Sequence, residues 1–128
     1  MQLHKLRPIV KYSDKTLDAF SWFFKVGGIA LFPFVILREK YRDSSEDFWR
    51  TRNRKVINHE SIHFQQALEL LVIPFYFLYV LEWFVKLFIY RSKAYQNISF
   101  EREAYANDGD LNYLSHRKRY NWIKRILR

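Results

Sequence analysis

The chain has 128 residues, which is room for one domain with one modest hydrophobic core. A net charge of +9 together with 20% aromatic residues favours an anionic membrane surface as a partner and makes nucleic acid a distant second. Because there is no cysteine, disulfides are excluded and any metal must be held by His, Asp or Glu.

The first third of the chain predicts one helix and one strand. Ser13 or Asp14 can cap a helix over residues 15–26, in which apolar residues recur at three- and four-residue steps. Residues 29–37 are apolar and rich in β-branched and aromatic side chains, as is typical of a strand. The internal Pro33 lacks an N–H, so we expect an edge strand.

The middle of the chain predicts two helices, over residues 53–73 and 75–90, with a break at Pro74. The second helix belongs to the most membrane-like stretch of the sequence. It also contains Glu82 and Lys86, which lie four residues apart and can pair. Because charges are costly inside a bilayer, we expect partial immersion, as an integral or monotopic membrane protein, and not a clean span.

The last third predicts a helix over residues 98–107 and a basic tail over residues 111–128. The tail mixes apolar and basic residues and is typical of an amphipathic helix on an anionic lipid surface, with a solvated helix as the alternative. The expected fold is therefore mainly α, with an apolar helical hairpin and a minor β component of one edge strand or small sheet.

Residues 59–63 read His-Glu-Ser-Ile-His, the H-E-x-x-H pattern. Residues four apart share one face of a helix, so His59 and His63 can bind one zinc ion while Glu60 handles protons beside them. A catalytic zinc usually has three protein ligands and an open position for water. No third histidine follows at a short spacing, so we expect a glutamate as the third ligand. The candidates are Glu101, Glu82 and Glu103. The alternative is a chance pattern with both histidines merely packed or solvated.

The segment Glu101-Arg102-Glu103-Ala104-Tyr105, taken with residues 59–63, resembles the E-x-x-A-D and H-E-x-x-H motif pair of gluzincin metallopeptidases. The likeness is to the membrane-embedded prenyl-protein and heat-shock proteases and their small relatives, the minigluzincins. It implies one zincin-like domain over residues 1–128, Glu101 as the third zinc ligand, and an edge strand along which a peptide substrate pairs. The sequence departs from the family at Tyr105, where an aspartate supports the zinc helix. Asp108, on the same helical face as Glu101, is a candidate to replace it.

Chain length sets a geometric condition on Glu101. One continuous helix over residues 64–90 would carry the chain about 40 Å from His63 at about 1.5 Å per residue. Residues 91–98, even fully extended, span at most about 28 Å. Either the chain reverses near Pro74 or Glu101 is not a ligand. We expect the reversal, which makes the segments on either side of the proline a hairpin that dips into the membrane without crossing it.

The expected function is zinc-dependent hydrolysis of a peptide or protein at or near a membrane surface, with Glu60 activating a zinc-bound water. The alternative is a non-catalytic, membrane-associated zinc-binding or adaptor protein with a vestigial site. A third, weaker hypothesis is a basic nucleic-acid binder that uses the tail. Gln66 either supports the metal site or makes an ordinary polar contact. Tyr105 and His116 are candidate oxyanion stabilisers, with structural roles favoured for both.

Overall fold

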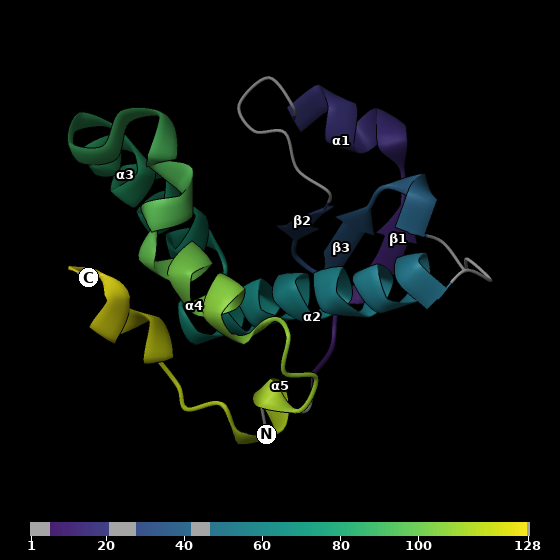
Figure 1. Ribbon diagram of the computed structural model, residues 1–128. Coiled ribbons are helices and arrows are strands. Elements are labelled where there is room, and N and C mark those ends of the chain that lie inside the picture. Colours follow the sequence, from purple (N-terminus) through teal and green to yellow (C-terminus); the bar gives the residue numbers. More distant parts are fainter. Residues whose placement is uncertain (1–5, 21–27, 42–46, 128) are drawn as a thin grey trace.

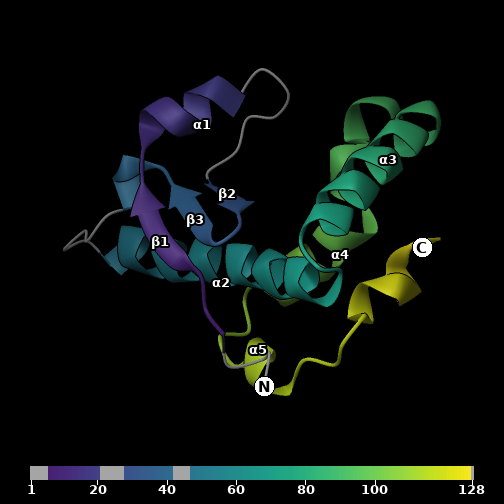
Figure 2. The same ribbon diagram turned by 180° about the vertical axis from the view of Figure 1, so that it is seen from behind.

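The computed structural model describes residues 6–20, 28–41 and 47–127, which are mainly helical with one small sheet, as predicted (Figures 1 and 2). The strands are β1 (Ile9–Tyr12), β2 (Gly28–Leu31) and β3 (Phe34–Leu37). The α-helices are α1 (Asp14–Phe20), α2 (Asp47–Glu69), α3 (Ile73–Tyr90), α4 (Ser99–Asn107) and α5 (Tyr113–His116). Short 3-10 helices are η2 (Glu39–Tyr41), η3 (Arg91–Lys93), η4 (Tyr95–Asn97) and η5 (Asn121–Arg125). Residues 21–26 of the first predicted helix lie outside the described ranges.

The sheet has the strand order β1-β3-β2, with β1 parallel and β2 antiparallel to β3. The prediction of one strand over residues 29–37 is wrong, because this segment folds into two strands joined by a turn at Phe32 and Pro33, whose peptide bond is cis. Pro33 needs no ladder hydrogen bond in the turn, which is why it is tolerated there. The edge position was correctly predicted for β2, whereas β3 is the central strand.

The long helix α2 is the element on which the rest of the fold is assembled. In both views the sheet lies over its N-terminal half, while α3 and α4 join it at its C-terminal half (Figures 1 and 2). Three clusters of buried side chains hold this arrangement together. The first is Ala67, Phe75, Ile98, Phe100 and Trp122. The second is Ile62, Ala104, Tyr113 and Leu114, and the third, beneath the sheet, is Val35, Leu37 and Tyr41.

The chain changes direction between α2 and α3, close to the predicted place. Leu71 and Val72 adopt left-handed backbone with φ of 61° and 70°, and the Val72 N–H donates to the Ala67 carbonyl at 2.7 Å, which ends the helix. Pro74 falls in the first turn of α3, where no helical hydrogen bond needs its N–H.

The hairpin that the sequence predicts from the segments on either side of Pro74 is formed by other segments of the chain. After the turn, α3 rises steeply from the end of α2 and does not fold back along it (Figures 1 and 2). The return is made at the far end of α3, where η3 and η4 bring the chain back until Ser99 donates to the Glu82 carboxylate. The hairpin is therefore formed by α3 and the segment that leads into α4.

The prediction of a helical tail over residues 111–128 is wrong. The chain forms the short α5, becomes extended at Arg117, and ends in the 3-10 helix η5. The Trp122 ring packs against Phe100 with ring centroids 4.6 Å apart, and Arg117 binds carboxylates of α2 and α4. These tertiary contacts hold the tail against the helices, and a continuous amphipathic helix could not make all of them.

Gly28 lies at a close contact between β2, the neighbouring strand β3 and Glu60 of α2. A Cβ added there would lie 2.6 Å from Leu37 Cδ2, 3.3 Å from the Ile36 carbonyl oxygen and 3.4 Å from Glu60 Cγ. Gly28→Ala should therefore lower the free energy of unfolding by about 1–3 kcal/mol through overpacking. Gly109→Ala is the matched control, because an added Cβ meets nothing within 4 Å there. Chemical denaturation of both variants tests this, and equal stabilities would contradict the described packing.

Candidate metal centre

The two histidines of the H-E-x-x-H pattern lie one turn apart on α2 and meet a glutamate of α4. The Nε2 atom of His59 lies 3.1 Å from one Glu101 carboxylate oxygen, and that of His63 lies 3.0 Å from the other. All three residues are buried, and one ligand atom from each lies within 4.8 Å of the others, so the cluster could hold a metal ion. Of the three glutamates that the sequence left open, Glu101 is the one that reaches the histidines.

Hydrogen bonds on the far side of each ring fix the orientation of the imidazoles. His59 Nδ1 lies 3.0 Å from Asp108 Oδ2, so Asp108, which the sequence suggested as a support for the metal-binding helix, contacts His59. His63 Nδ1 lies 2.7 Å from Gln66 Oε1. The Gln66 amide nitrogen is engaged with Glu103 and a backbone carbonyl, so its oxygen must face the histidine. Both Nδ1 atoms therefore carry hydrogen in the neutral rings, and both Nε2 lone pairs face Glu101.

With both rings neutral, the hydrogen-bond acceptors of His59, His63 and Glu101 face one another at the centre of the cluster. Although His63 Nε2 is 3.0 Å from Glu101, it is a buried atom without a hydrogen-bond partner among the described residues. Two imidazole lone pairs and an anionic carboxylate repel one another unless a cation lies between them. The donor set of two nitrogens and one carboxylate matches that of metal sites in proteins, so the residues present fit a metal ion.

Protons take the place of the cation in the metal-free protein. Burial lowers the pKa of His59, but hydrogen bonds to Asp108 and Glu101 and the charges of Glu60 and Glu101 outweigh it and raise the pKa to about 10. Burial raises the pKa of Glu101, but His63 and His59 together hold it well below its usual range. Metal and protons therefore compete for the same buried positions.

Glu60 lies beside the cluster and lines a cavity of about 250 Å³. Burial is the main cause of its raised pKa; the charge of Glu101 adds to this, and those of His59 and His63 oppose it. The cavity is also lined by His59, Asp108, Tyr95 and Tyr105. A carboxylate of this kind, at the wall of a cavity next to a metal centre, can accept a proton from a molecule bound there.

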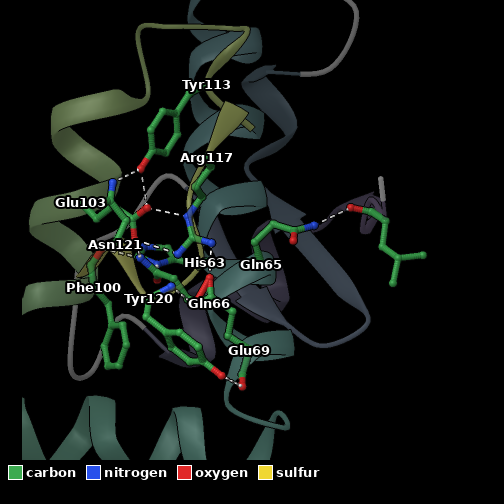
Figure 3. A network of polar contacts seen from close by, with 11 residues as sticks. His63, Gln65, Gln66, Glu69, Phe100, Glu103, Tyr113, Arg117, Tyr120 and Asn121 are labelled. Carbon is green, nitrogen blue, oxygen red and sulfur yellow. Dashed lines mark hydrogen bonds and ion pairs between the residues drawn. The ribbon is translucent and has the colours of Figure 1, made fainter. Parts of the chain in front are cut away.

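A buried polar network connects His63 to the tail of the chain (Figure 3). Arg117 binds Glu69 of α2 and Glu103 of α4, and Tyr113 donates its hydroxyl to Glu103 at 2.6 Å. Glu103 in turn accepts from the Gln66 amide at 2.9 Å, which orients the oxygen that faces His63. Of the two readings of Gln66, the structure therefore favours support of the metal site.

The remaining candidates from the sequence have other partners. Glu82 accepts two hydrogen bonds of 2.6 Å from Ser99 and pairs with Lys86 at 2.9 Å, which confirms the predicted pair and leaves Glu82 outside the cluster. His116 is exposed and lies 3.3 Å from Asp110. Tyr105 packs edge-on against His59 with centroids 4.6 Å apart.

Tyr79 is a site residue that the sequence did not single out. Its hydroxyl donates to Glu101 at 2.6 Å and so holds the carboxylate from the side of α3. The surrounding residues of α3 are almost all apolar or aromatic, and nothing in their order distinguishes this tyrosine from its neighbours. Arg117 also went unnoticed, because its two carboxylate partners are distant in the sequence.

No protein-family model, curated protein or solved structure matches the chain. The likeness to gluzincins rests on the two motifs alone and stays a prediction.

Zinc affinity should rise with pH, because His59 must lose its proton to bind the ion. In the metal-free protein, the stability that protonated His59 contributes is fully present below its ordinary pKa of 6.5 and is lost as pH rises through about 10. Between these values, apparent affinity should increase by up to about tenfold per pH unit for each proton released. Competition titration with a chromophoric chelator at about pH 6.5 and about pH 8.5 measures the effect.

His116→Gln is the control for this titration, because His116 is exposed and lies outside the cluster. It should reproduce the wild-type pH dependence. A zinc affinity that does not change with pH would contradict proton competition at the buried histidines.

Proposed function

We propose that the protein is a zinc-dependent peptide hydrolase of gluzincin type that works at a membrane surface. The observation that carries the proposal is the convergence of His59, His63 and Glu101 on one point, where His63 Nε2 lacks a hydrogen-bond partner among the described residues, with Glu60 on the wall of the adjoining cavity. The two imidazoles and the carboxylate would hold the ion. Zinc, when bound, supplies Lewis-acid polarisation of a water and of a peptide carbonyl.

The side chains of the chain perform the proton transfers and the positioning. Glu60 accepts a proton from the attacking water and delivers it to the amine that leaves when the peptide bond breaks. Asp108 and Gln66 keep the imidazoles in the tautomer that presents Nε2 to the ion. Tyr79 keeps Glu101 in place by its short hydrogen bond.

The edge strand β2 supports the proposal that a peptide substrate binds as an added strand. The Tyr76 hydroxyl accepts from the Phe32 N–H at 2.8 Å and donates to the Ala30 carbonyl at 2.9 Å, so it engages the end of this strand nearest the turn. The other end of β2 begins at Gly28, which lines the cavity beside Glu60. We therefore place the substrate backbone against the Gly28 end of the strand.

Glu60→Gln should retain zinc and lower the rate of peptide hydrolysis by about 10²–10⁴-fold, because the amide cannot accept the proton. Zinc content is measured on the same samples as cleavage of a fluorogenic peptide library. Glu39→Gln, an exposed position in η2, is the control and should leave the rate unchanged. Unchanged hydrolysis in Glu60→Gln would contradict the mechanism. Bound zinc with no cleavage by the wild type would instead favour the non-catalytic alternative.

The membrane part of the proposal rests on the outer face of α3. The segment Ile73–Lys93 is long and apolar enough to cross a membrane by length and composition, and only 11% of its most apolar window is buried. The exposed large apolar residues of α3 are Ile73, Phe77, Val80, Leu81, Phe84, Val85, Phe88 and Ile89. A contiguous surface of this size is typical of sites that meet another apolar phase or partner.

The charged residues of α3 are turned inward. Lys86 is 5% exposed, pairs with Glu82, and donates to the carbonyls of Asn97 and Ile126. α3, all of which is described, therefore carries no exposed charged side chain. We propose that α3 lies in the headgroup boundary with its apolar face toward lipid, and that exposed basic residues such as Arg91 contact anionic headgroups.

Replacing two outer rings of α3, in Phe84→Ser/Phe88→Ser, should weaken binding to vesicles containing phosphatidylserine at least tenfold. We expect this loss because a Phe side chain that is fully buried in an apolar phase contributes about 1.5–3 kcal/mol to the free energy of binding. Leu111→Ser, at an exposed apolar residue outside α3, is the control. Vesicle flotation measures the bound fraction. Equal binding by the double variant and the wild type would show that α3 does not face lipid.

A further inference from the structure

We propose that the cavity beside the metal centre binds a carboxylate of the substrate, so that the protein prefers peptides with an acidic group two or three residues from the bond that is cut. The acidic group would be a Glu or Asp side chain or a free terminal carboxylate. This inference rests on the proposed peptide hydrolysis and names the substrate class for that site.

The cavity is bounded at one end by the metal centre and farther along by cations. Its wall includes His59 and Glu60, and also Lys55 and Arg52, all from α2. Lys55 and Arg52 precede His59 by four and seven residues, which places them one and two turns back along the same side of the helix. At about 1.5 Å per residue, their backbones lie roughly 6 Å and 10 Å from that of His59 along the axis.

The two acidic residues of the cavity wall, Glu60 and Asp108, both lie beside His59. Glu60 is buried beside the two histidines, and Asp108 accepts a hydrogen bond from His59. Lys55 Nζ lies 3.9 Å from Asp108, at the limit of an ion pair, and its side chain is half exposed. Arg52 is exposed at the outer part of the same wall. The outer cavity is therefore cationic on the side of α2.

The remaining wall suits a ligand with both polar and apolar parts. Tyr41, Tyr95 and Tyr105 also line the cavity and add aromatic rings to its wall. An extended peptide advances about 3.4 Å per residue. A side chain two or three residues from a carbonyl held at the metal centre would therefore come opposite Lys55 or Arg52. Charges of one sign in a recessed, partly apolar cavity attract an opposite charge more strongly than they do on an open surface.

The experiment measures equilibrium binding of labelled peptides to the zinc-loaded protein by fluorescence anisotropy at low salt. Eight-residue peptides with amidated ends carry a single Glu, Gln or Lys, scanned along the sequence, and a further Gln peptide has a free terminal carboxylate. We expect the best Glu peptide to bind about fivefold more tightly than its Gln counterpart, with the Lys peptide weakest. Comparison with the free-terminus peptide shows which source of carboxylate is preferred.

Three variants connect this preference to the cavity. Arg52→Gln and Lys55→Gln should each reduce the preference for Glu over Gln, and combining them should abolish it. Lys118→Gln removes the same charge from an exposed position outside the cavity and should preserve the preference. Because Lys55 is near Asp108, zinc content is measured in every variant. If Lys55→Gln loses the metal, the result for Arg52→Gln alone decides the test.

The outcomes separate this inference from the proposed hydrolysis. Equal binding of the Glu, Gln and Lys peptides, or loss of the preference in Lys118→Gln to the same extent as in Arg52→Gln, would overturn the carboxylate subsite. Selective binding of the Glu peptide without cleavage of any peptide would support the subsite and refute the hydrolase. Cleavage without any preference for acidic peptides would support the hydrolase and refute the subsite.

Discussion

Three buried acceptors meet at one point of the fold, and the rest of the structure is arranged around them. The Nε2 atoms of His59 and His63 face the Glu101 carboxylate at 3.1 Å and 3.0 Å, in a region from which water is largely removed. Such a cluster is destabilising unless positive charge is added, by protons or by a metal ion. Because α2 supplies the imidazoles and α4 the carboxylate, the cation that satisfies them also binds the two helices together.

The supports of this cluster come from separate parts of the chain. Asp108 follows α4, Tyr79 belongs to α3, and the path through Gln66 and Glu103 ends at Arg117 in the tail. Each of these contacts orients one of the three residues whose ligand atoms face the cation. Folding of the tail and of α3 therefore determines the geometry at the centre, and binding of a metal there should be coupled to the stability of the whole helical part.

The sequence predicts which residues gather at the site better than it predicts the path of the chain. Glu101 was suggested by the resemblance of residues 101–105 to the second gluzincin motif, and Asp108 by its place on the same helical face as Glu101. Pro33 was assigned to the interior of one strand. A proline within an apolar run does not by itself show whether the run is a single strand or two strands joined by a turn. Tyr79 and Arg117 were missed because their roles depend on partners brought close only by the tertiary fold.

X-ray absorption spectroscopy of the zinc-loaded protein tests the central claim most directly. The account predicts one zinc bound by two imidazole nitrogens and a carboxylate oxygen at about 2.0–2.2 Å. His63→Ala should lose one imidazole from the spectrum or lose the metal, whereas His116→Ala, at an exposed position outside the cluster, should give the wild-type spectrum. Unchanged coordination in His63→Ala, or a wild-type spectrum without imidazole, would contradict the account.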